Sequence, residues 1–119
     1  MLLAARSFGP ALACGNAVVA KPDVKTPITC LWLTAILEEA GVPPGVVNIV
    51  PGSGTTAKAL TNASDIDSIT FTGSVKTGRR VLESCAQNIT PAVVELGSKS
   101  PVVLMDDGDV AGAAGSVVD

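Results

Sequence analysis

The sequence predicts an α/β protein in which a parallel sheet carries helices on both faces. Short, continuous apolar runs, typical of strands that are buried on both faces, alternate with segments of helical spacing. This alternation indicates βαβ units, whose right-handed crossovers place helices on both sides of a sheet. The polar and glycine-rich interruptions all follow the predicted strands. Ligands of parallel sheets bind at these carboxyl ends, so we expect a site there.

The size and composition of the chain limit what it can be. Its 119 residues suit one domain, and 47% apolar with 16% charged residues indicate a globular protein. A net charge of -3, one Trp, two Phe and no Tyr argue against a nucleic-acid partner. The apolar runs are shorter than the roughly 18–20 residues of a membrane span. We therefore expect no nucleic-acid or membrane partner, and a cytoplasmic location.

The cysteines point to no metal site and no disulfide framework. Cys14, Cys30 and Cys85 are far apart and odd in number, and the chain has no histidine. Cys30 and Cys85 lie on predicted helix faces, which favours buried structural thiols. Without histidine, Ser-His-Asp and Cys-His catalysis within this chain is excluded.

The first half of the chain predicts two helices around a strand. "MLLAARSFGPALACG" is interrupted by Arg6 and by Gly9-Pro10, unlike a signal peptide, and we interpret it as a helix. "NAVVAK" (Asn16–Lys21) is the first strand. In "TPITCLWLTAILEEAG", Thr26 suits the N-cap, Pro27 the first turn, and Gly41 the left-handed position after the helix. The spacing predicts a core-facing stripe of Ile28, Leu31, Trp32, Ala35 and Ile36.

The second half continues the alternation. "VVNIV" (Val46–Val50) and "SITFT" (Ser68–Thr72) are predicted strands, and "PGSG" leads from the first of them into a helix with Ala57 and Leu60. The helix after "SITFT" is expected to turn one face to the core, and two further strands and a final helix follow. That face holds Val75, Gly78, Leu82 and Cys85; the strands are Ala92–Leu96 and Pro101–Met105; the last helix begins in "DVAGAAGSVVD".

Three strand ends carry candidate functional residues, each with a plain alternative. Gly73 permits close approach, and Ser74 with the next amides can bind an anion, or Ser74 is only an N-cap. Lys21 can reach sugar hydroxyls or a phosphate, or it is a solvated lysine. Glu95 interrupts an apolar strand, where desolvation would make it a candidate base. The alternative is a glutamate paired with Lys99 or open to water.

Taken together, these strand ends resemble the aldehyde dehydrogenase superfamily. The resemblance rests on four motifs in the family's order, and it covers essentially residues 1–119. They are "GPALACGNAVVAKP" (Gly9–Pro22), "EEAGVPPGVVNIVPGSG" (Glu38–Gly54), "FTGSVKTG" (Phe71–Gly78) and "VELGSKSP" (Val94–Pro101). The resemblance implies a Rossmann-like fold, and that residues 1–119 are part of an NAD(P)-binding domain.

The resemblance also implies roles for individual residues. Lys21 matches the lysine that binds the adenosine ribose, or the 2′-phosphate of NADP. Glu95 matches the active-site base, and Leu96 the residue whose carbonyl meets the nicotinamide amide. The other implied cofactor-binding residues are the glycines beside the adenine side, Gly52 and Gly54, and the diphosphate-binding segment with Phe71, Thr72, Gly73, Ser74 and Gly78.

The activity implied by the resemblance is oxidation of an aldehyde to a carboxylic acid by NAD or NADP, through a cysteine thioester. Family members are typically homodimers or homotetramers. None of the three cysteines matches the nucleophile, and the oxyanion-binding asparagine is absent too. We expect an internal fragment that is inactive alone and does not form the family's oligomers. The alternative is a non-catalytic, truncated module for nucleotide binding or subunit association.

Two positions depart from the family pattern. Val24 replaces a glutamate that NAD-preferring members use on the ribose hydroxyls, and Lys21 and Lys25 lie nearby. Loss of that carboxylate removes its repulsion of a 2′-phosphate, so use of both NAD and NADP is expected. Ser98 stands at a glycine of the pattern, which would cost on the order of 1 kcal/mol if the backbone there has φ > 0.

Overall fold

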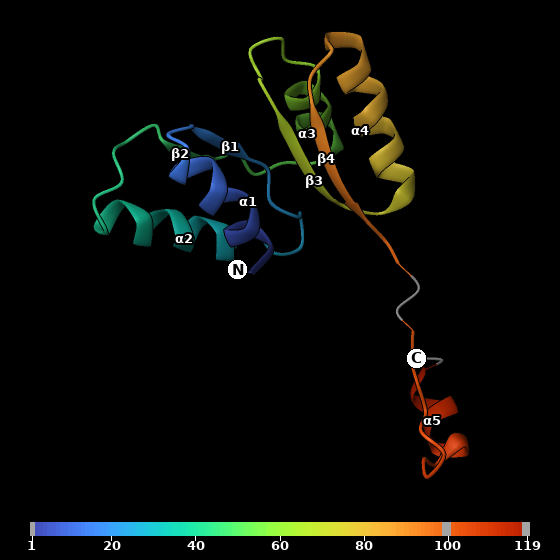
Figure 1. The fold of residues 1–119 in the computed structure, drawn as a ribbon. Coiled ribbons are helices and arrows are strands. Elements are labelled where there is room, and N and C mark those ends of the chain that lie inside the picture. Colours follow the sequence, from blue (N-terminus) through green and yellow to red (C-terminus); the bar gives the residue numbers. More distant parts are fainter. Residues whose placement is uncertain (1, 99–100, 118–119) are drawn as a thin grey trace.

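The computed structural model describes residues 2–98 and 101–117, which form helices and strands in alternation (Figure 1). The first four elements are α1 (Leu2–Ala13), β1 (Val18–Ala20), α2 (Pro27–Glu39) and β2 (Val47–Ile49). The other five are α3 (Gly54–Thr61), β3 (Ile69–Gly73), α4 (Val75–Asn88), β4 (Ala92–Leu96) and α5 (Val110–Val117). Of the predicted elements, only the strand over Pro101–Met105 is wrong, because these residues form no strand.

The strands are parallel, which confirms the α/β fold class, and they form two separate pairs. In the first pair, Val18 of β1 lies opposite Val47 of β2. In the second, Ile69 of β3 lies opposite Ala92 of β4. Within the described residues, no ladder joins one pair to the other. The expected parallel sheet is therefore divided between β1–β2 and β3–β4.

The helix ends follow the local sequence closely. Pro27 is the first residue of α2, and Gly41 after it has a φ of 93°, as predicted. The side chains of Ser53 and Ser74 cap α3 and α4. Thr26 occupies the N-cap position of α2 but makes no capping hydrogen bond through its side chain.

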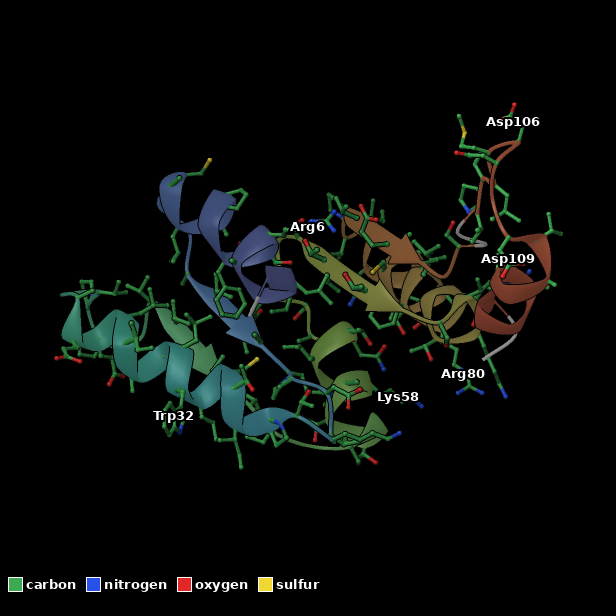
Figure 2. The ribbon with its side chains drawn as sticks, turned by 90° about the horizontal axis from the view of Figure 1, so that it is seen from below. Arg6, Trp32, Lys58, Arg80, Asp106 and Asp109 are labelled. Atoms are coloured by element: carbon green, nitrogen blue, oxygen red, sulfur yellow. The ribbon has the colours of Figure 1, made fainter. Side chains whose placement is uncertain are left out.

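The predicted core stripe of α2 is wrong. Trp32 is 71% exposed and Ile28 is 66% exposed, and Leu31, Ala35 and Ile36 are exposed as well. The half-buried side of the helix instead carries Cys30, Leu33, Thr34 and Leu37. Because the helix is apolar nearly all round, its spacing fits more than one stripe. Figure 2 shows Trp32 pointing outward from α2.

The buried face of α4 was predicted only in part. Gly78 and Cys85 are buried as expected, and the third buried residue is Val81. Val75 and Leu82, which were assigned to this face, are exposed. Gly78, Val81 and Cys85 are spaced about one helical turn apart, so they form a narrow strip on one side of α4. Helix α4 packs against β3 and β4.

The strands are not buried on both faces, contrary to the expectation. Val19 in β1 and Val93 in β4 are exposed. In the β3–β4 pair the residues that alternate with the covered ones stay accessible, so one face of this pair is open. The buried apolar core of the described residues is accordingly small, and consists of Phe8, Val47, Val81 and Cys85.

The chain after β4 leaves the rest of the molecule. A further parallel strand needs a crossover of a dozen or more residues, and only residues 97–100 separate β4 from Pro101. Val102, Val103 and Met105 are exposed, and α5 follows at the far end of the chain, as predicted (Figure 1). None of the helices in residues 2–98 and 101–117 is long and apolar enough to cross a membrane.

Candidate functional site

The carboxyl ends of β1 and β2 bring Lys21 and Gly52 together. The two strands end level with each other, because the Val50 amide donates to the Ala20 carbonyl at 2.9 Å. The half-buried Lys21 Nζ donates to the carbonyl of Pro22 and, at 3.3 Å, to the carbonyl of Gly52. An ammonium has three donors, so these two bonds leave one for another acceptor. Lys21 is therefore held in place, not free in solvent.

Two glycines at the start of α3 differ in what surrounds them. A Cβ at Gly52 would run into the side chain of Thr56, so Gly52 is required by packing within the chain. At Gly54, nothing lies within 4 Å of where a Cβ would be. Ser53 between them caps the helix by accepting from the Thr55 amide at 3.4 Å. The first turn of α3 is thus open to close approach at Gly54.

The turn from β3 into α4 is closed by Ser74. Its hydroxyl oxygen accepts from the Thr77 amide at 3.3 Å, and its hydroxyl donates to Thr77 Oγ1 at 3.1 Å. The simple N-cap is therefore what the side chain of Ser74 forms here. The Thr77 amide is therefore already hydrogen-bonded, to Ser74 Oγ. The amides of Val75 and Lys76, in the first helical turn, have no acceptor within the helix.

Close packing of α4 on β4 places this turn beside Leu96. A Cβ at Gly78 would overlap the side chain of Leu96, so glycine allows the helix to approach the strand. Gly73 lies opposite Leu96 in the parallel register. A Cβ at Gly73 would meet the ring of Phe71, which packs under the turn. Gly73, Ser74, Gly78 and Leu96 are thus gathered at the same end of the β3–β4 pair.

Glu95 lies on the open face of β4, opposite the exposed Thr72 of β3. Its side chain is 53% exposed, so the expected partial desolvation is wrong for this chain. Its Oε1 lies 3.4 Å from Nη2 of Arg6 on α1. The alternative partner Lys99 lies outside the described residues.

Arg6 is a residue that the sequence analysis did not connect to the site. It is the one charged side chain of α1. Its side chain is 56% exposed, so its sequence context did not require an acidic partner. The sequence separation of 89 residues hid its pairing with Glu95.

The candidate residues form two groups that the helices connect. Lys21, Gly52 and Gly54 lie where β1 and β2 end, and the remaining residues lie where β3 and β4 end. Between the groups, α3 and α4 run side by side (Figure 1). Near their far ends, Asn88 Nδ2 donates to the Asn62 carbonyl at 3.1 Å.

The cysteines take no part in either group. Cys85 is 3% exposed within the packing of α4, as predicted for a structural thiol, while Cys30 is half-buried and Cys14 exposed. Among the described residues, no cluster of histidine, cysteine, aspartate or glutamate could hold a metal ion.

Comparison with known proteins shows the family to which these 119 residues are similar. A sequence model of the aldehyde dehydrogenase family matches residues 1–119. "Aldehyde dehydrogenase, cytosolic 1" of Elephantulus edwardii is 46% identical over 112 residues, which cover 92% of this chain and 22% of that protein.

Solved structures of two bacterial proteins have the same fold over most of the chain. The NAD⁺ complex of an aldehyde dehydrogenase from Bacillus cereus is 39% identical, with a TM-score of 0.83, over 95% of this chain and 23% of that one. An NADP dependent enzyme of E. coli is 40% identical, with a TM-score of 0.81, over 92% of this chain and 23% of that one. The chain thus spans about a fifth of the length of these relatives.

Proposed function

Because this chain belongs to the aldehyde dehydrogenase family, we propose that it forms the cofactor-binding core of an NAD(P)-dependent oxidoreductase that converts an aldehyde to a carboxylic acid. The observation that carries the proposal is the contact of Lys21 Nζ with the Gly52 carbonyl at 3.3 Å, beside the open first turn of α3. It joins two residues that lie 31 positions apart and that the family resemblance assigns to the same cofactor.

The adenosine half of the dinucleotide would lie at the ends of β1 and β2. Lys21 keeps one donor available for a ribose hydroxyl or a 2′-phosphate, and the bare backbone at Gly54 leaves room for a flat ring system. The diphosphate would lie at the turn after β3. There the first amides of α4 and the positive end of the helix dipole suit an anion, and the cation Lys76 lies in the same turn.

The reacting end would lie beside β4. When bound, the dinucleotide supplies a hydride acceptor. The carbonyl of Leu96 would orient the nicotinamide amide, and the carboxylate of Glu95 would take a proton from a thiol or a water molecule. The side chain of Arg6, 3.4 Å from Glu95 Oε1, would help to hold this carboxylate in position. We propose that the isolated chain oxidises no aldehyde, because none of its cysteines lies in either group of site residues.

Both dinucleotides are proposed as ligands. Val24 lies in the loop between β1 and α2, is 61% exposed, and presents no carboxylate to repel a 2′-phosphate. The Bacillus cereus relative was solved with NAD⁺, and the E. coli relative is NADP dependent. A cytoplasmic location is proposed from the relative that is named cytosolic.

Calorimetric titration of the chain with NAD and, separately, with NADP tests this proposal. We expect both to bind, and Lys21→Met to weaken NADP more than NAD, because the 2′-phosphate adds charge. Each loss should be at least tenfold. The matched control is Lys58→Met, which removes an exposed lysine from the last turn of α3 (Figure 2). A well-folded chain that binds neither dinucleotide, or equal losses in the two lysine variants, would contradict the proposal.

A further inference from the structure

We draw no further inference here: the strongest candidate, the groove of about 490 Å³ between α2 and β2, carries nothing because no feature of residues 2–98 and 101–117 shows what covers it.

Discussion

Individual glycines at the strand ends serve different physical purposes. Gly52 and Gly78 lack a side chain because a neighbouring side chain, Thr56 or Leu96, occupies the space. Gly54 lacks one although the space is open. The family resemblance assigned all three glycines to cofactor binding, but the surroundings single out Gly54 as the one without a packing explanation. Packing alone explains the other two.

Gly78→Ala should destabilise the chain by about 1–3 kcal/mol, because the added methyl group overpacks the contact of α4 with Leu96. This loss would outweigh the roughly 1 kcal/mol that alanine gains over glycine inside a helix. The measurement is the free energy of unfolding in urea. Gly54→Ala is the control, and it should be neutral or slightly stabilising. Equal stability of Gly78→Ala and wild type would show that Leu96 moves aside freely.

The ion pair of Arg6 with Glu95 should contribute little to stability. The two side chains are 56% and 53% exposed and 3.4 Å apart, so water screens their attraction. A double-mutant cycle with Arg6→Ala and Glu95→Ala should give a coupling free energy below about 1 kcal/mol. A coupling of several kcal/mol would mean that the pair is far less hydrated than its exposure indicates.

Among the secondary-structure elements, α4 ends in an unusual way. Ile89 follows its last residue with a φ of 56°, in the left-handed region, and its side chain is 88% exposed. Glycine is the usual residue at this position, because a Cβ is strained there. The next amide, of Thr90, donates to the Cys85 carbonyl at 2.9 Å and keeps the chain in this conformation. The backbone of Ile89 is therefore strained, and a glycine at this position would relieve the strain.

Ile89→Gly should stabilise the chain by about 1 kcal/mol, because it relieves the left-handed strain and loses almost no buried surface. Thermal and urea unfolding would both record the gain. Ile89→Ala retains a Cβ and should gain clearly less. A loss of stability in the glycine variant would imply that the exposed isoleucine contacts another part of the protein or another chain.

Local patterns predicted most elements and their caps. The glycine and proline positions around α2 and the serine caps depend on the nearest few residues, so short stretches of sequence suffice. Burial depends on what covers each element, and there the patterns failed. The core-facing residues of α2 were predicted wrongly because this helix is apolar nearly all round. Residues 101–105 have the composition of a strand, but they pair with no strand of the described residues.

In the candidate site, too, local sequence predicted some features, while others depend on the tertiary fold. The positions of Lys21, Gly73 and Ser74 at strand ends follow from the order of the elements, and the structure confirms them. Their roles toward a dinucleotide came from the family resemblance, because spacing alone left the anion site and the simple N-cap equally open. The pairing of Arg6 with Glu95 needs the tertiary fold, which brings the side chain of Arg6 on α1 to Glu95 on β4.

The molecule as a whole is more extended than its length requires. Its radius of gyration is 18.0 Å, whereas a compact domain of this length has about 13–14 Å. The two strand pairs and the outlying α5 account for this shape (Figure 1). A dinucleotide that contacts both Lys21 and the turn at Ser74 would connect the two strand pairs. Cofactor binding is therefore the property that most depends on the whole arrangement.

The central claim is that the turn after β3 binds the diphosphate, and substitutions at Ser74 test it most directly. Aspartate and asparagine both cap helices as well as serine, so Ser74→Asp and Ser74→Asn should fold alike. Only the aspartate adds a negative charge where the diphosphate would lie. In calorimetric titrations with NAD, we expect Ser74→Asn to bind within a few-fold of wild type and Ser74→Asp to lose at least tenfold. Equal binding by the two variants would contradict the claim and place the diphosphate elsewhere.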